Sequence, residues 1–152
     1  MAFYYVSSVV GAAIGTPSSL TKRTGAFSAM TPSDVFVSLF DLNAYVTLAD
    51  GDYVFIASDH AFDYSQATTL NMVSTTSAYV AYSSVDSDFC DKYKKGASER
   101  VTSGAFTLFS VGHSTQNSVI NGVSFSAVSG LLKVSSYQSS TIFNDCTLFA
   151  SS

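Results

Sequence analysis

The last third of the chain repeats itself at a fixed spacing of 23 residues. Residues 105–113 align with 128–136, and residues 118–127 align with 141–150. Few positions are identical, but apolar and polar positions stay in phase, as is typical of stacked structural repeats. The aligned pairs are Leu108 with Leu131, Phe109 with Leu132, Val111 with Val134, Val119 with Ile142, Ile120 with Phe143, Asn121 with Asn144, Val123 with Cys146, Phe125 with Leu148 and Ala127 with Ala150.

The repeating unit has the pattern of β-strands. Its short apolar runs alternate with a period of two and are rich in β-branched and aromatic residues. Strand repeats of this length favour a parallel β-solenoid, in which each coil buries its inward side chains only by stacking on a neighbour about 4.8 Å away. A β-sandwich, whose strands also recur at short intervals, is the alternative.

The composition excludes two classes of protein. Of the 152 residues, 47% are hydrophobic and only 12% are charged, which is not the composition of a disordered chain. The formal charge is −4, so the chain lacks the basic character of a nucleic-acid-binding protein. The length fits a single domain. Low charge with many hydroxyl side chains suits a protein that works inside a larger assembly.

The two cysteines predict neither a disulfide framework nor a metal site, because both need more sulfur or closer spacing. Cys146 aligns with Val123 and is interpreted as a small buried hydrophobic residue, while Cys90 carries no prediction. The first positive residue is Lys22, so the apolar N-terminal stretch lacks the basic region of a secretory signal. No apolar run is long enough to span a bilayer. We expect a protein made in the cytoplasm, with no membrane partner.

We interpret residues 1–152 as one β-solenoid domain. Residues 1–50 hold a first strand, a linking segment and a helix, and residues 51–152 form the coils. A densely charged segment at 86–100 interrupts them and is interpreted as a solvated excursion, with a partner-binding loop as the alternative. Besides the repeats, strands are predicted at residues 3–10, 53–57, 68–73 and 78–82.

One helix is predicted, at residues 32–47. Thr31, Pro32 and Asp34 form a typical helix start, and the ADGD sequence at 49–52 favours its end. We expect this helix to cover the open end of the coil stack, because the apolar interior would otherwise face water. The side chains predicted to point inward are Val35, Leu39, Leu42 and Val46.

No constellation of residues predicts catalysis. His60 and His113 lack the spaced partners of a metal site. Combining His60 with Asp59 or Asp63 and one of the many serines carries little information, since no nucleophile elbow is present. Asp145 is the only acidic residue after residue 101, in the part of the chain that contains the repeats. We therefore expect no catalytic residue, no metal and no cofactor, and interpret the upstream acids as turn residues; these are Asp59, Asp63, Asp86, Asp88 and Asp91.

The order of these segments resembles that of right-handed parallel β-helix structural proteins of tailed bacteriophages. The resemblance is carried by the opening strand FYYVSSV, the stretch ADGD followed by YVFIASDHA, and the repeats VINGVSFSA and TIFNDCTLFA. The last two look like coils of pectate-lyase-like proteins. The resemblance implies an all-β, right-handed parallel β-helix with one short N-terminal capping helix. It assigns no catalytic residue to this chain.

By this resemblance we expect a non-enzymatic virion structural protein, either a capsid decoration or cement protein or a tail-associated component. Phage β-helices commonly associate in threes, which implies a homotrimer seated on other virion proteins. The alternative is a glycan-binding or glycan-cleaving tailspike or tail-fibre adhesin module. Such a module would stack sugars on exposed tyrosines, for which the candidates are Tyr64, Tyr79, Tyr82 and Tyr137.

The repeat also predicts the core and a weak point. Six residues of the first repeat, Leu108, Val111, Val119, Ile120, Val123 and Phe125, should bury against Leu131, Val134, Ile142, Phe143, Cys146 and Leu148 of the second, with one or two of them turned outward by the alternation of a strand. Beyond the second repeat, Phe143, Leu148 and Phe149 would face water. We expect further coils or other subunits to cover them, because exposed strand edges with apolar side chains aggregate.

Overall fold

The computed structural model describes residues 1–12, 21–49, 51–71 and 80–151, without the side chains of 109–117 and 136–140. One α-helix and ten strands are present in this part of the chain. The strands are β1 (Phe3–Val6), β2 (Tyr53–Ala57), β3 (Ala61–Tyr64), β4 (Thr68–Asn71), β5 (Val80–Val85), β6 (Ser98–Val101), β7 (Phe106–Asn121), β8 (Ser124–Ala127), β9 (Leu132–Asn144) and β10 (Thr147–Ala150).

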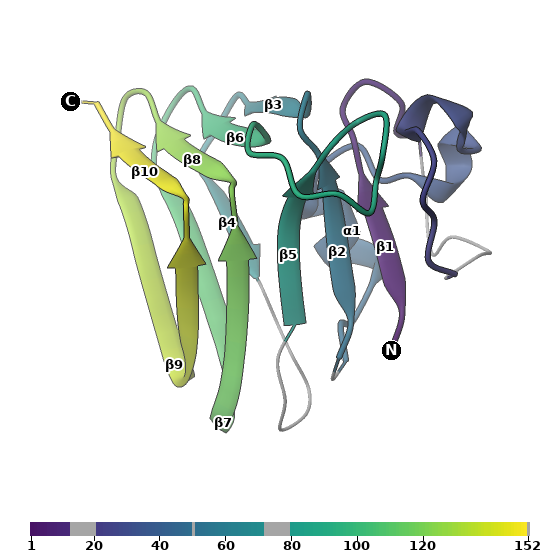
Figure 1. Cartoon of the computed structure of the whole chain (residues 1–152). Helices are drawn as coiled ribbons and strands as arrows, with labels where there is room; N and C mark the ends of the chain where they lie inside the picture. Colours follow the sequence, from purple (N-terminus) through teal and green to yellow (C-terminus); the bar gives the residue numbers. More distant parts are fainter. Residues whose placement is uncertain (13–20, 50, 72–79, 152) are drawn as a thin grey trace.

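Every pairing between these strands is parallel. One sheet has six strands in the order β1-β2-β5-β7-β4, with β9 also paired to β7, and the other has four in the order β10-β8-β6-β3 (Figure 1). The long strand β7 pairs with β4 through its first residues and with β5 through its last. The predicted all-β architecture with parallel strands is confirmed, and the facing antiparallel sheets of a β-sandwich are not observed among the described strands.

The predicted repeat is confirmed in its second half and wrong in its first. Ile120 lies opposite Phe143, and Phe125 opposite Leu148, as the spacing of 23 requires. In the first half, Leu108 lies opposite Val134, three positions beyond the predicted Leu131. The register shifts between Val111 and Gln116, where a β-bulge or irregularity interrupts the pairing of β7 with β9. A bulge of this kind adds residues to one strand only, which a gapless alignment cannot reveal.

The matched sequences NGV and NDC make the same turn in successive repeats. Gly122 has a φ of 68° and Asp145 a φ of 51°, so both adopt the left-handed conformation that Gly tolerates best and Asp better than most residues. The side chains of the preceding asparagines stack, with Nδ2 of Asn144 donating to Oδ1 of Asn121 at 3.0 Å. The repeated turn therefore aligns β7 with β9 and β8 with β10.

The main core lies between the two sheets. Predicted core residues Leu108, Ile120, Val123 and Phe125 are buried there, and Val119 is half-buried. The side chain of Val111 lies outside the described part. Rings from successive strands contact one another at the centre, for Phe106 lies 5.9 Å from both Tyr64 and Phe125 between ring centroids.

A second apolar cluster lies outside the larger sheet. Tyr5 of β1 and Phe55 of β2 pack there with Phe27 and Cys90, which belong to the segment after residue 21 and to the charged excursion. The amide of Phe27 donates to the carbonyl of Ser87 at 2.8 Å and joins these two segments. Burial raises the pKa of the Cys90 thiol to about 11, which keeps it a neutral thiol. The interpretation of the excursion as wholly solvated is therefore wrong.

Two predicted boundaries also need correction. The first strand ends at Val6 instead of residue 10. The charged excursion ends before residue 98, because β6 begins there and pairs with both β3 and β8. Glu99, predicted to be in a solvated loop, is fully buried. Its neighbours in sequence alternate inward and outward, which is the pattern of a strand.

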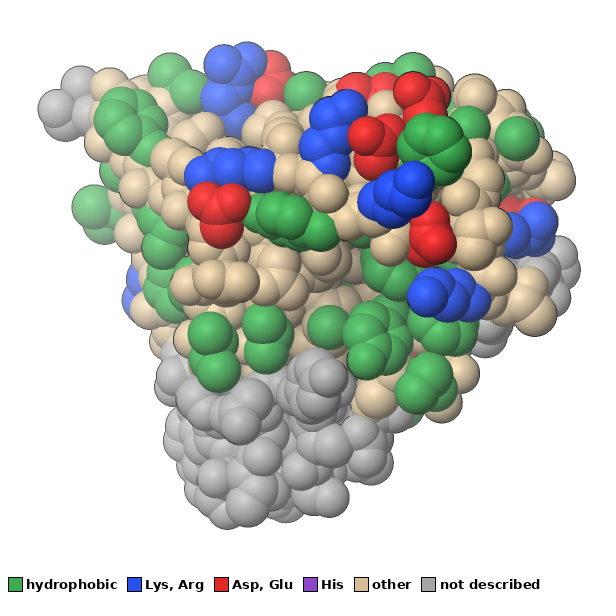
Figure 2. All heavy atoms as spheres, viewed as in Figure 1, with side chains coloured by type: hydrophobic (Ala, Val, Ile, Leu, Met, Phe, Trp, Pro, Cys, Tyr) green, Lys and Arg blue, Asp and Glu red, His purple; other side chains and the backbone are tan. Residues whose placement is uncertain are grey.

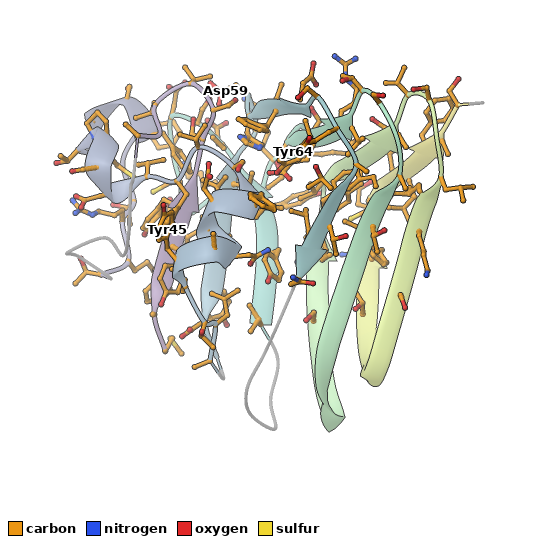
Figure 3. The ribbon with its side chains drawn as sticks, turned by 180° about the vertical axis from the view of Figure 1, so that it is seen from behind. Tyr45, Asp59 and Tyr64 are labelled. Atoms are coloured by element: carbon orange, nitrogen blue, oxygen red, sulfur yellow. The ribbon has the colours of Figure 1, made fainter. Side chains whose placement is uncertain are left out.

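The predicted helix at 32–47 divides into two short elements. Pro32–Asp34 is a 3₁₀ turn, Phe36 forms a parallel bridge with Val6, and α1 spans only Leu39–Tyr45. Ser38 caps α1, with Oγ accepting from the amide of Asp41 at 3.1 Å, whereas Thr31 makes no side-chain cap. The predicted inward residues Val35, Leu39 and Leu42 are buried, and Val46 packs against the core. The helix lies beside β4 (Figure 3).

Candidate functional site

The strands β9 and β10 form an apolar edge at the C-terminal side of the structure, which we call the C-terminal edge. Its exposed side chains are Leu131 (74% exposed), Val134 (46%), Ile142 (50%), Leu148 (42%) and Phe149 (56%). The prediction that Leu131, Val134, Ile142 and Leu148 are buried is wrong for two reasons. Val134 and Leu148 share a face with the buried Leu108 and Phe125, but no described strand packs beyond them. Leu131 and Ile142 point to the outer face of their sheet, because their neighbours Leu132 and Phe143 point to the core. Phe143 and Cys146 are partly buried against the main core.

The backbone is also accessible along the C-terminal edge. Within the described strands β9 pairs only with β7, and β10 only with β8. Alternate amides and carbonyls of a parallel strand point to opposite sides, so half of those in β9 and β10 face away from their partners. A strand edge with apolar side chains above it is a surface on which another strand can add. Figure 1 shows this edge at one end of both sheets.

A buried carboxylate, Glu99, connects β6 with the N-terminal segments. Its Oε1 accepts from the amide of Leu39 at 2.7 Å and lies 3.2 Å from Nε2 of His60, and its Oε2 accepts from the hydroxyl of Tyr64 at 2.7 Å. Three donors around one carboxylate compensate the cost of removing it from water. Position 99 stacks between Phe62 of β3 and Phe125 of β8, so an apolar residue would be the ordinary choice there.

His60 serves this cluster through both ring nitrogens. Its Nδ1 accepts from the backbone amide of Ser8 at 2.9 Å, which leaves Nε2 to carry the proton and donate to Glu99. The hydroxyl of Ser8 accepts from the amide of Ala61 at 3.0 Å. The ring therefore contacts no serine hydroxyl through these bonds, and Asp59 and Asp63 are not its partners. The arrangement fixes the chain and does not resemble a nucleophile with its general base.

The Tyr64 hydroxyl completes the cluster. Burial, together with the neighbouring Glu99 carboxylate, raises the pKa of Tyr64 far above its usual range. The same hydroxyl accepts from the amide of Phe40, at 3.4 Å, at the start of α1. Figure 3 labels Tyr64 beside α1. The first turn of α1 is therefore tied to Glu99 directly and through Tyr64.

The tyrosines proposed to stack sugars are placed differently from the prediction. Tyr64 and Tyr82 are buried, with 9% and 1% of their surface exposed, so neither can present a ring face to a sugar. Tyr79 and the side chain of Tyr137 lie outside the described part of the chain. The prediction is wrong for the two tyrosines that can be judged.

The upstream acids do not converge on one site. Asp63 pairs with Arg100 across β3 and β6, and this guanidinium lowers the pKa of the carboxyl. Asp86 accepts from the amide of Asp88 and pairs with Lys94. The remaining three, Asp59, Asp88 and Asp91, are exposed, and Figure 3 labels Asp59.

The charged excursion reaches across two repeats to Asp145. The hydroxyl of Tyr93 donates to Oδ2 of Asp145 at 2.6 Å, and Nζ of Lys95 lies 2.9 Å from Oδ1. Between them lies Gly122, where a β-carbon would come within 2.8 Å of the Tyr93 hydroxyl. Hydrogen bonds from Lys95 and Tyr93 lower the pKa of Asp145, and the bond to Asp145 raises the pKa of Tyr93 to about 12. The excursion is thus a surface strap over the turns.

Sequence reasoning missed Glu99 and the role of His60. The only signal was the alternation of SERV, which places Glu99 and Val101 on the same face. His113 was predicted to bind no metal, and its side chain lies outside the described part. Within the described ranges, no group of three His, Cys, Asp or Glu residues is arranged to hold a metal ion. In the same ranges no helix has the length and apolar character to cross a membrane.

No known protein family, curated protein or solved structure matches this chain.

Proposed function

We propose that the chain is a right-handed parallel β-helix capped by α1, and that it is a non-enzymatic structural component of a bacteriophage virion. The fold is supported by strands that follow one another in three rows. One row contains β3, β6, β8 and β10. A second row contains β4 and the first parts of β7 and β9, and the third contains β1, β2, β5 and the last parts of β7 and β9. Successive strands in this order, all parallel, are what a β-helix requires.

The C-terminal edge is the observation that carries the structural role. Side chains such as Ile142, Leu148 and Phe149 are about half exposed there, above strand edges that can pair with another chain. A surface of this kind is used for association and is costly to leave in water. The buried polar cluster, in contrast, contains a carboxylate and a histidine whose hydrogen bonds are made within the protein.

Within a virion, the chain is proposed to act as a capsid decoration or cement protein, with a tail-associated role as the nearest variant. The phage β-helix proteins that the sequence resembles commonly form trimers. A homotrimer that seats the C-terminal edge on its own subunits or on another virion protein would remove the exposed apolar side chains from water.

Labelling of particles tests the virion role. Gold-conjugated antibodies against the purified chain would be applied to particles of the phage that encodes it and viewed by electron microscopy. Label on the head supports decoration, and label on the tail supports the variant. Particles that contain no chain, by labelling and by mass spectrometry of their proteins, would refute the proposal.

Sedimentation tests the trimer independently. The chain at micromolar concentration should sediment as a trimer, and replacing Ile142 and Leu148 by Ser should shift it toward monomer without unfolding it. A stable, soluble monomer of the unaltered chain would rule the trimer out while leaving the virion role to the labelling experiment.

A further inference from the structure

A hollow of about 520 Å³ lies between α1 and the strands β3 and β4. Its wall on the helix side is Phe40, and its floor is the continuous stretch from Phe62 to Thr69, followed by Asn71. A smaller hollow of about 150 Å³ continues past Asn43 and shares Phe40 and Asn71 with the first. Figure 3 shows α1, Tyr64 and β4 on this side of the molecule.

The floor of the hollow is the outer edge of a sheet. In the order β10-β8-β6-β3, β3 is the last strand, so β6 pairs with one of its sides only. The carbonyls of His60 and Tyr64 accept from Ser98 and Thr102 on the β6 side. Because successive backbone groups alternate in direction, those of Ala61 and Asp63 point away from β6. The amide of Ala61 donates to the hydroxyl of Ser8, so the backbone groups of Asp63, beside the bend at Ser65, are the ones that face the hollow.

The side chains above this edge are apolar at two points and acidic at one. Phe40 is 48% exposed, and Phe62 is half-buried. Asp63 is about half exposed, and although it pairs with Arg100, its carboxylate is at the surface where a second cation can share it. The whole chain carries a formal charge of −4, which also favours a basic partner.

An unsatisfied donor lies beside the smaller hollow. Nδ2 of Asn43 is buried, and among the described residues no acceptor lies within hydrogen-bond distance of it. A buried amide without an acceptor costs free energy that a ligand carbonyl would recover. Asn43 lies in the wall of the smaller hollow, beside Phe40 and Asn71, so a carbonyl that enters there would reach Nδ2 once the side chain rotates toward it.

We propose that this hollow binds an extended peptide segment of a partner protein, which adds as a further strand along the free edge of β3. The segment carries a Lys or Arg beside Asp63 and an apolar side chain over Phe40. The alternating amides and carbonyls of a strand edge match a peptide backbone, and side-chain contacts at every second position give specificity. The inference rests on this edge alone and does not depend on the virion role.

The experiment follows the backbone amide signals of the isotope-labelled chain by NMR during titration with a hexapeptide. The probe is acetylated at its N-terminus and amidated at its C-terminus. Valine occupies every second position, and threonine or arginine occupies the positions between. Two N-methylated forms are compared, with methyl groups on alternate residues of opposite phase. Strand addition predicts that the probe shifts the amides of Asp63 and Ser65. One methylated form should bind at least tenfold more weakly, and the other within about twofold of the parent.

Two variants test the charge. Asp63→Lys should weaken binding of the arginine peptide at least tenfold and favour the same peptide with glutamate in its place. Asp86→Lys, which alters another ion-paired surface acid far from the hollow, is the matched control and should leave binding unchanged. Unaltered amide spectra elsewhere would show that both variants fold.

Three results would overturn the inference. The first is no shift at Asp63 and Ser65 up to millimolar peptide, and the second is equal binding of both methylated forms. The third is that a neutral oligosaccharide, maltohexaose, shifts these amides while the peptide does not, which would identify the hollow as a sugar site.

Discussion

The two ends of the strand stack are covered in different ways. At the N-terminal end, where β1, β3 and β4 are the first strands of their rows, α1 places Leu39 and Leu42 in the core with at most 1% of their surface exposed. At the C-terminal edge, Val134 and Leu148, which pair with the buried Leu108 and Phe125, keep 46% and 42% exposure. A helix of this chain covers the core at one end, whereas no described segment covers it at the other.

The comparison shows that burial depends on having a neighbour on both sides. Phe125 and Leu148 occupy matched positions in β8 and β10, and both are apolar. Phe125 is fully buried because β6 and β10 flank its strand, whereas Leu148 has only β8 beside it. The difference in exposure arises from position in the stack and not from the kind of residue.

The N-terminal end is also fixed in place by polar bonds. Glu99 of β6 accepts from the first amide of α1, and Tyr64 of β3 contacts both Glu99 and the next amide. Hydrogen bonds to a buried charge are directional, so they specify where the helix begins. The C-terminal edge presents mainly apolar side chains, and apolar side chains are visible at the left of Figure 2, where Figure 1 places β9 and β10.

The largest expected effect is loss of the N-terminal cover. Leu39→Asp removes a buried apolar side chain and places a charge in the core, so the free energy of unfolding should fall by at least about 4 kcal/mol. Tyr45→Asp, on the exposed side of the same helix, is the matched control and should change it far less. Urea denaturation of both variants measures the difference. Equal losses would show that α1 does not close this end.

Truncation at matched positions compares an inner strand of one row with the strand at its C-terminal edge. Phe125→Ala should cost about 3–5 kcal/mol, because it leaves a cavity in the core. Leu148→Ala in the last strand should cost about 1 kcal/mol or less in the isolated monomer, because the side chain is already partly in water. The measurement is again the free energy of unfolding. Similar losses at both positions would mean that the C-terminal edge is covered in solution.

The third effect concerns the polar cluster. Tyr64→Phe removes a buried hydrogen bond to Glu99 and should cost about 1.5–3 kcal/mol at neutral pH. The pKa of Tyr64 is raised in the folded protein, so its contribution is complete below the usual tyrosine pKa of about 10 and is lost as pH rises above it. The cost of the variant should therefore shrink in alkaline solution. A cost independent of pH between 8 and 11 would contradict this role.

The repeat predicted much of the fold because the alternation of apolar and polar residues can be recognised within each strand separately. The pairings of Ile120 with Phe143 and Phe125 with Leu148 follow from the spacing alone. The register of the first half could not be predicted from the spacing, because the irregularity after Val111 is set by the pairing between β7 and β9. The helix was predicted too long, since an apolar stripe also continues through Phe36, which bridges to β1.

The candidate sites were harder to predict from the sequence. Glu99 lies in a run of charges, and only the folded neighbours His60 and Tyr64 show that it is buried. Tyr64 was expected at the surface, because a tyrosine in an alternating strand suits either face. Exposure of the C-terminal edge, in contrast, was foreseen from the position of the last repeat, although four of its residues were also expected in the core.

The smallest expected effect is at the surface strap that joins the middle of the chain to its last turn. Asp145→Asn keeps a residue that tolerates a φ of 51° but removes the negative charge that Lys95 and Tyr93 contact. The pKa of Asp145 is lowered in the folded protein, so the strap stabilises the fold above the usual aspartate pKa of about 4, and that stabilisation is lost as pH falls below it. The variant should melt at a slightly lower temperature than the unaltered chain at pH 7 and at the same temperature near pH 2.

Hydrogen exchange at residues 93–97 should quicken in this variant at pH 7, while exchange in β7 and β9 stays the same, because an exposed ion pair holds the loop more than the sheet. Faster exchange throughout β9 would instead show that the strap secures the C-terminal edge itself.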